Sequence, residues 1–303
     1  ASCIFLMTAF FWVRPRNTAI PPWGSALWEV AAMIDALVEM FSYRFMVRAG
    51  VVGLLVSLCA ALLGVCLVLK RYSMIGDGHV GVGALAVASA LGLAPMAVAV
   101  PVVVVAAFLL LRLSSRGKLK GDAMIAMIST AALAVGVIAL SLSNGTTGDV
   151  NNYLFGSVLA MTRSDVALSV VLSVTVLALY LLFYHQIFAV TFDESFSRAT
   201  GLKVEACNTL LAILTALTIV LGMRMMGAML ISSLVIFPAL TAMRLFRSFR
   251  GVILCAAVTS VVCFCVGLTI SFAFSTPVGA TVVAADLTVF LLSCLTAALR
   301  RKA

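Results

Sequence analysis

Three ionisable side chains lie inside strongly apolar stretches of this sequence. Asp77 and His79 occur together in SMIGDGHVGVGAL, and Asp286 occurs in GATVVAADLTVF. An ionisable group surrounded by hydrocarbon is costly, so it marks a functional site by default. A carboxylate and an imidazole together can bind a borderline divalent cation such as zinc, and they can also transfer protons. Asp77, His79 and Asp286 are therefore the candidate site, as a pathway for a metal ion or for protons.

Each of the three residues also has a purely structural interpretation. In that interpretation Asp77 caps a helix, with Gly76 and Gly78 as turn residues. His79 is then a hydrogen-bonded histidine of the core, and Asp286 is an interior carboxyl bonded to Ser or Thr hydroxyls. Asp286 is the hardest to explain in this way, because it lies about ten residues into the last apolar segment, near the middle of a bilayer.

The elements that must hold these residues are membrane-spanning helices. Of the 303 residues, 64% are hydrophobic and 10% are charged, and the mean hydropathy is +1.22. Soluble domains are about half apolar and a quarter charged, so this composition excludes a soluble globular protein, a disordered chain and a nucleic-acid-binding domain. The apolar runs are too solid for a membrane β-barrel, whose strands alternate apolar and polar residues.

A span needs about 20 apolar residues, which predicts an all-α integral membrane bundle of about eight to nine transmembrane helices. We place them near 47–69, 77–94, 95–112, 123–143, 164–187, 206–222, 226–243, 252–274 and 277–299. Residues 1–32 contain a Pro- and Arg-rich stretch that breaks any helix, and we interpret them as an N-terminal extension. Residues 33–303 form a single transmembrane domain in this interpretation.

Loops with many basic residues and loops with few alternate along the chain, as expected for loops on opposite sides of a membrane. One set of loops, with the C-terminal segment, contains 14 of the 20 Lys and Arg residues: Lys70, Arg71, Arg112, Arg116, Lys118, Lys120, Arg198, Lys203, Arg244, Arg247, Arg250, Arg300, Arg301 and Lys302. The opposite set, after residue 69, contains only Arg163 and Arg224. Cytoplasmic loops carry the excess of Lys and Arg, so the first set and the C-terminus are predicted to be cytoplasmic.

The most polar interior stretch is residues 189–205, AVTFDESFSRATGLKVE. Phe192, Phe196 and Ala199 have the spacing of one apolar stripe on a short helix, and Gly201 can end that helix. Glu194 and Arg198 are four residues apart, the spacing of a favourable helical ion pair. A short amphipathic helix that projects from a membrane bundle is suited to docking in a groove of another protein. The alternative is a solvated connecting helix.

Several motifs that would carry catalysis do not occur in the sequence. There is no GxxxxGK[ST] phosphate-binding loop, no HExxH and no GxSxG. The chain thus has no ATPase motif of its own, and we predict that it is not an enzyme.

Five strings of the sequence are similar to one family of transporters. They are RYSMIGDGHVGVGALA at 71–86, NNYLFGSVL at 151–159, FDESFSRATGL at 192–202, MRMMGAMLISSLVIFPALTAMRL at 223–245 and, more weakly, PVGATVV at 277–283. Together they resemble the membrane permease subunits of ABC importers for zinc, manganese and iron, the ZnuB-like family. The resemblance covers about residues 33–299.

This resemblance implies a homodimeric permease in the cytoplasmic membrane of a bacterium. It implies three kinds of partner: a separate cytoplasmic ATPase subunit, an extracytoplasmic solute-binding protein that delivers the metal, and a second copy of the chain. Nucleic acid is not among them. Residues 192–202, with Phe192, Asp193, Glu194, Phe196, Arg198 and Gly201, correspond to the segment that contacts the ATPase. No permanently bound cofactor is implied; the divalent metal, zinc in preference to manganese or iron, is cargo.

The candidate metal motif departs from the family pattern. Members of the family read GDGLSH or GDALSH, with Asp and His four residues apart, whereas Asp77 and His79 are two apart. Two residues turn an ideal helix by about 200°, so the two side chains would face apart. We hypothesise that Asp286 compensates as a ligand. The alternative function is a proton-coupled secondary transporter that uses Asp77, His79 and Asp286 as a relay, and a third is a membrane enzyme with Asp77 and His79 as an acid–base pair.

Overall fold

The structure, a computed structural model, describes residues 44–70, 79–90, 101–106, 121–142, 163–274 and 276–302. Contacts divide the chain into Ala1–Glu39 and Met40–Ala303, and all described residues belong to the second unit. Within these ranges the fold is all helical, without a strand. The helices are α3 (Arg44–Leu69), α4 (His79–Ala90), α6 (Gly121–Leu142), α8 (Arg163–Leu182), α9 (Tyr184–Phe192), α10 (Glu194–Ala199), α11 (Val204–Met226), α12 (Ala228–Leu245), α13 (Phe249–Phe274) and α14 (Val278–Lys302).

Five of these helices are long and apolar enough to cross a membrane: α3, α11, α12, α13 and α14. A sixth span results if α8 and α9, which are bent by 67° at Phe183, are taken together. The all-α membrane bundle is therefore confirmed. The predicted count of eight to nine stays a prediction, since most of the span predicted at 95–112 and parts of its neighbours lie outside the described residues.

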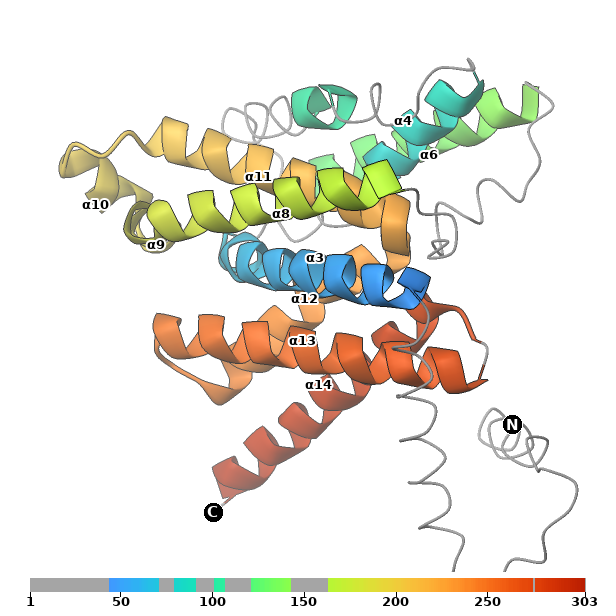
Figure 1. The fold of residues 1–303 in the computed structure, drawn as a ribbon. Helices are drawn as coiled ribbons and strands as arrows, with labels where there is room; N and C mark the ends of the chain where they lie inside the picture. Colours follow the sequence, from blue (N-terminus) through green and yellow to red (C-terminus); the bar gives the residue numbers. More distant parts are fainter. Residues whose placement is uncertain are drawn as a thin grey trace, which may run out of the picture. The chain divides into compact units, whose positions relative to one another are not determined.

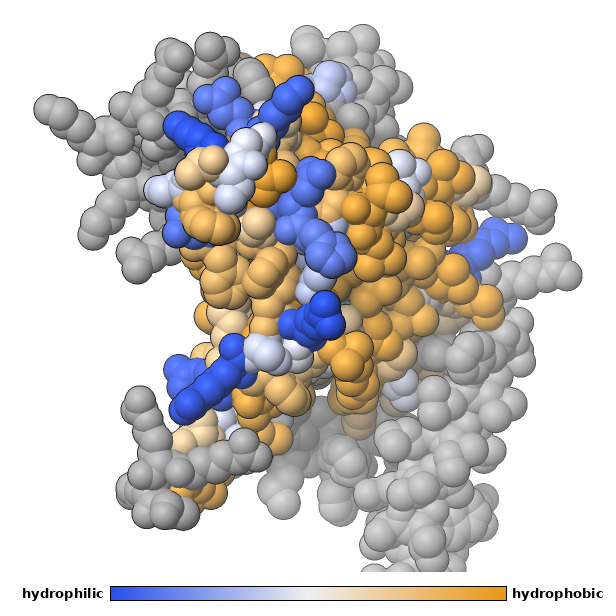
Figure 2. All heavy atoms as spheres, turned by 90° about the vertical axis from the view of Figure 1, so that its left-hand side faces the viewer, coloured by the Kyte–Doolittle hydropathy of each residue, from blue (hydrophilic) through white to orange (hydrophobic). Residues whose placement is uncertain are grey.

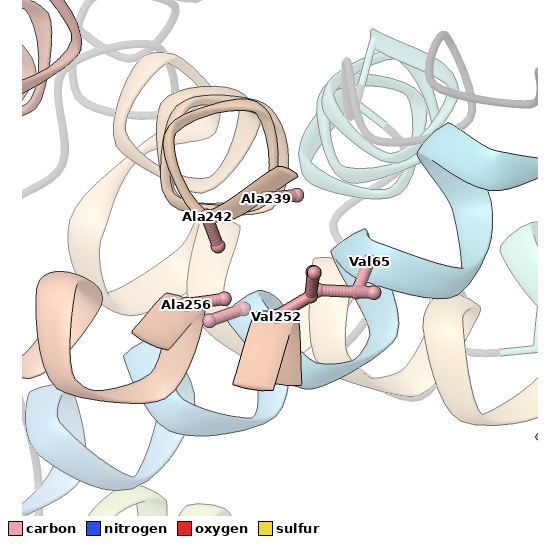
Figure 3. Close-up of a cluster of buried hydrophobic side chains, with 6 residues drawn as sticks. Val65, Ala239, Ala242, Val252 and Ala256 are labelled. Atoms are coloured by element: carbon pink, nitrogen blue, oxygen red, sulfur yellow. The ribbon is translucent and has the colours of Figure 1, made fainter. Parts of the chain in front are cut away.

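Helices α3 and α12 form the centre of the bundle, and α13, α11 and α8 pack around α3 (Figure 1). Small residues allow the central helices to approach closely. A Cβ atom on Gly64 of α3 would lie only 2.1 Å from the backbone oxygen of Val235 in α12. Beside this crossing, one buried cluster joins α3, α12 and α13 (Figure 3), and its members are Ala61, Val65, Ala239, Ala242, Val252 and Ala256. Such small-residue contacts are the usual means of helix association in a membrane.

The short helix α4, which begins at His79, packs against α6 by the same means. A Cβ atom on Gly83 would lie 2.2 Å from the backbone oxygen of Ala132. Ala84 and Ala88 of α4 are buried. The packing of α4 therefore also depends on small side chains at helical spacing.

The outer helices α13 and α14 present apolar side chains outward. Leu254, Val258, Val262 and Val266 are exposed at four-residue intervals along α13. The span of α14 is the least buried of the five. An exposed apolar stripe of this kind suits contact with lipid hydrocarbon.

The two ends of the bundle differ in polarity. One end, which we call the α10 end, contains α10, the end of α3, the α12–α13 connection and the C-terminal end of α14 (Figure 1). Hydrophilic side chains gather on the face at this end, against an apolar body (Figure 2). Lys70, Arg198, Lys203 and Arg244 all belong to it. The described basic loops of the predicted cytoplasmic set therefore meet at one end. At the other end Gly227, with φ +90 and ψ 155, connects α11 to α12, in a backbone region that only glycine adopts readily.

Candidate functional site

The predicted metal residues are described to different extents. Asp77 lies outside the described residues, as does the segment between α3 and α4 that contains it. His79 is the first residue of α4, and only its backbone is described. In the described part of the chain, no three His, Cys, Asp or Glu side chains come together. The metal role of Asp77 and His79 therefore stays a prediction.

Asp286 is placed in full, and it is buried, with 1% of its surface exposed. The Ser233 hydroxyl of α12 lies 3.4 Å from its Oδ2 and 2.9 Å from the backbone oxygen of Leu230. The other carboxyl oxygen, Oδ1, has no hydrogen-bond partner among the described residues. Cys263 of α13 interacts with the same carboxyl. A long hydrogen bond from Ser233 and the interaction with the Cys263 thiol compensate this buried carboxylate poorly for its lost hydration, so its chemistry suits the binding of a cation or a proton.

Asp286 and His79 belong to helices with different neighbours. Helix α14 packs on α12 and α13, whereas α4 packs on α6 and, less extensively, on α11. The structure thus brings Asp286 together with Ser233 and Cys263, neither of which the sequence analysis singled out. The hydroxyl partner of Asp286 agrees with the structural interpretation of this residue. Its Oδ1, which accepts no hydrogen bond from the described residues, agrees with the functional interpretation.

The predicted docking segment is built from two helices. Phe192 ends α9, and Asp193 has extended backbone with φ −146 and ψ 102. Its carboxylate accepts a hydrogen bond of 2.9 Å from the backbone N–H of Phe196 and so caps α10. The prediction of one helix carrying Phe192, Phe196 and Ala199 is therefore wrong, because this cap starts a new helix.

Gly201 ends α10 as the sequence indicates. It has φ +84, and the N–H of Leu202 donates to the backbone oxygen of Ser197 across 3.0 Å. This is the hydrogen bond that closes a helix at a left-handed glycine.

Two large apolar side chains of this segment are exposed. Phe192 is 61% exposed and Phe196 is 65% exposed, whereas Ser197 is fully buried. Helix α10 thus turns its serine toward the bundle and its phenylalanine away from it. Exposed aromatic side chains are enriched in protein interfaces, so this geometry suits a docking role.

An aromatic stripe that the sequence analysis missed holds α9 on the bundle. Tyr184, Phe188 and Phe192 are four residues apart, and the ring of Phe249 in α13 lies 5.8, 4.7 and 5.6 Å from theirs. The spacing was visible in the sequence as an i, i+4, i+8 pattern. The partner Phe249 was not, because it is more than fifty residues away.

A ring of three polar side chains fixes α10 to the ends of two long helices. Lys70, just after α3, donates from Nζ to Glu194 Oε1 across 2.9 Å, and it also donates to Asn208 Oδ1 of α11. Asn208 Nδ2 donates to the same Glu194 Oε1 across 3.1 Å. We call Lys70, Glu194 and Asn208 the polar clamp. Glu194 therefore forms its ion pair with Lys70. The helical spacing had favoured Arg198 as its partner instead.

The polar clamp keeps Glu194 ionised. Partial burial acts to raise the pKa of its carboxyl, but the hydrogen bonds from Lys70 and Asn208 and the charges of Lys70 and Arg198 lower the pKa below its ordinary value. A carboxyl with a lowered pKa stabilises the folded state above its ordinary pKa, and this contribution is lost as the pH falls through the folded-state pKa. The Glu194 carboxylate is therefore ionised at neutral pH.

Comparison with known proteins agrees with this architecture. The profile of the ABC 3 transport family matches residues 42–297. The chain belongs to the ABC 3 transport family. The match begins before α3 and ends within α14, and it extends across Asp77, His79 and Asp286.

Named relatives of this ABC 3 permease belong to metal transport systems. It is 28% identical over 257 residues to the manganese transport system membrane protein MntC of Halalkalibacterium halodurans, covering 84% of this chain and 88% of MntC. It is 29% identical over 253 residues to the high-affinity zinc uptake system membrane protein ZnuB of Haemophilus influenzae, covering 83% of this chain and 97% of ZnuB. PsaBC from Streptococcus pneumoniae, solved in complex with Fab, superimposes with a TM-score of 0.75 at 27% identity, covering 87% of this chain and 95% of that one. The resemblance predicted from the five sequence strings is thereby confirmed.

Proposed function

We propose that this permease imports a divalent metal ion, zinc in preference to manganese or iron, using ATP hydrolysed by a separate subunit. The observation that carries the proposal is the family match over residues 42–297, together with relatives named for zinc and manganese transport. The preference for zinc rests on the chemistry of His79 and Asp77, because an imidazole and a carboxylate suit zinc.

The proposal includes three protein partners. A cytoplasmic ATPase docks on the α10 end through the segment 192–202, where Phe192 and Phe196 are exposed. An extracytoplasmic solute-binding protein delivers the metal to the opposite end, and a second copy of the chain completes the pathway. The α10 end and the C-terminus are cytoplasmic in this proposal, since the basic residues gather there.

The proposal is tested by reconstituting the permease with its ATPase and solute-binding protein in proteoliposomes. We expect uptake of radioactive zinc that requires ATP and is abolished by vanadate, with less uptake of manganese and iron(II) under the same conditions. Liposomes with an ATPase variant that cannot hydrolyse ATP serve as the control. Uptake by the permease alone, driven by a proton gradient, would instead establish the secondary-transporter alternative.

Asp286 is proposed as part of the metal pathway, and its carboxylate can be removed with little change of shape. We expect Asp286→Asn to lower the initial rate of metal uptake by about tenfold or more, the usual range for residues that support a metal ion. The reason is that the amide keeps a contact with Ser233 but offers no charge to a cation. Uptake is measured in the same proteoliposomes.

The matched control for Asp286 is Ser260→Ala. Ser260 is also fully buried, and its hydroxyl donates to the backbone oxygen of Ser57 across 3.0 Å. It should lower stability slightly and leave the uptake rate per folded permease unchanged. The role of Asp286 is refuted if Asp286→Asn and the more severe Asp286→Ala both transport metal at the wild-type rate.

A further inference from the structure

The polar clamp differs from an ordinary surface ion pair. Only 7% of the Lys70 side chain is exposed, although its partner Glu194 is 50% exposed. Exposed ion pairs contribute little, because water screens them and both side chains must be ordered. A lysine that is almost fully covered must instead keep its partners, since losing them leaves an unpaired buried charge. The contact between α3 and α10 at this point is therefore specific.

The polar clamp joins elements that are distant in the sequence. Lys70 follows the central helix α3, Glu194 is the first residue of α10, and Asn208 lies in the first turns of α11. Both Lys70 and Asn208 hydrogen-bond to the same oxygen of Glu194. A displacement of α10 thus acts on the ends of two membrane-spanning helices through one carboxylate oxygen.

Lys70 is also close in the sequence to the predicted metal residues. It precedes Asp77 by seven residues and His79 by nine. Helix α3 itself is held along its length by α12, α13, α11 and α8. The end of this helix at Leu69 and Lys70 is the part that the polar clamp attaches to α10.

We propose that the polar clamp is the link through which movement of α10 reaches the membrane-spanning helices α3 and α11. Lys70 and Asn208 act as positioning residues: through their hydrogen bonds with Glu194 they transfer the displacement of α10 to the ends of α3 and α11. This inference rests on the proposed function, and it adds to it the residues through which nucleotide hydrolysis and metal movement are coupled.

The test is the number of metal ions imported for each ATP hydrolysed. We expect Lys70→Met to leave the ATPase bound to the permease and hydrolysing ATP close to the wild-type rate, while metal import for each ATP falls by about tenfold, within the usual range for coupling between two sites. Methionine fills the same covered space without charge. Glu194→Gln keeps a hydrogen-bond acceptor for Lys70. It should therefore lower this ratio of metal ions imported to ATP hydrolysed less than Lys70→Met does.

Two further variants separate coupling from folding and from docking. In Lys70→Met/Glu194→Met both charges are removed, so Glu194 is not left without its ion-pair partner. The complex should be at least as stable as with Lys70→Met alone, while the number of metal ions imported for each ATP stays low. Lys203→Gln removes an exposed lysine at the same end of the bundle and should leave the ratio unchanged.

The outcomes distinguish this inference from the proposed function. If Lys70→Met and Glu194→Gln import as much metal for each ATP as the wild type, the polar clamp has no coupling role. If uptake and ATP hydrolysis fall in equal proportion, or the ATPase dissociates, the polar clamp serves assembly only and the inference is wrong. If the wild-type complex itself imports no metal, the proposed function has failed, and the inference with it.

Discussion

Replacing Gly64 with alanine is expected to prevent most of the permease from accumulating in folded form. The added Cβ would lie 2.1 Å from the backbone oxygen of Val235 and 2.9 Å from its carbonyl carbon. Neither atom belongs to a flexible side chain, so α3 and α12 must move apart at the centre of the bundle. Overpacking a core costs about 1–3 kcal/mol when side chains can yield. We expect a loss at or above the upper end of that range.

The measurement is the yield of monodisperse protein in detergent and its thermal midpoint. The matched control is Gly50→Ala in the same helix, where the nearest atom to the added Cβ is Leu268 Cδ2 at 3.9 Å. That is an ordinary contact, and alanine favours a helix over glycine by about 1 kcal/mol. Gly50→Ala should therefore be neutral or slightly stabilising. Equal midpoints for the two variants would contradict the close crossing of α3 and α12.

The second large effect is expected from Phe196→Asp, which should release the ATPase from the permease. Phe196 is 65% exposed and projects from a helix that is fixed at both ends, by the Asp193 cap and by Gly201. A central aromatic residue of an interface commonly contributes 2 kcal/mol or more, and a charge in its place also adds a desolvation cost. We therefore expect the affinity for the ATPase to fall by more than about tenfold.

This affinity can be measured with the permease in nanodiscs and the ATPase in solution. Phe196→Leu keeps an apolar side chain and should restore most of the binding. Phe246→Asp introduces the same charge at another exposed phenylalanine, 48% exposed, outside the segment 192–202, and should bind the ATPase normally. An ATPase that binds Phe196→Asp as tightly as the wild type would show that the docking surface lies elsewhere.

The sequence predicted the long helices well, because each is a continuous apolar run bounded by charges or glycines. The spans expected at 47–69, 206–222 and 252–274 correspond to Met46–Leu69, Val204–Met223 and Phe249–Phe274. Gly201 was recognised as a helix end, since few other residues adopt its backbone conformation without strain. Local signals of this kind depend on neighbours in the sequence.

Other features of the site could not be predicted, because they depend on contacts between residues that are far apart in the sequence. Lys70 and Glu194 are separated by 124 residues, and no local pattern indicates that they meet. Ser233 and Cys263 were two among many small polar residues until packing placed them beside Asp286. The break at Asp193 did have a local signal, a carboxylate three residues before the N–H that it caps, but the apolar spacing of Phe192 and Phe196 favoured one continuous helix.

The crossing of α3 and α12 also constrains how the protein is made. Gly64 and Val235 are about 170 residues apart in the sequence, so at roughly 5–20 residues per second a ribosome needs roughly 10 to 35 s to synthesise the second after the first. During that delay the surface of α3 around Gly64, which lies against Val235 in the folded bundle, has no α12 to pack against. The central helix of the permease is thus synthesised early, and its packing against α12 waits until residue 235 has been made.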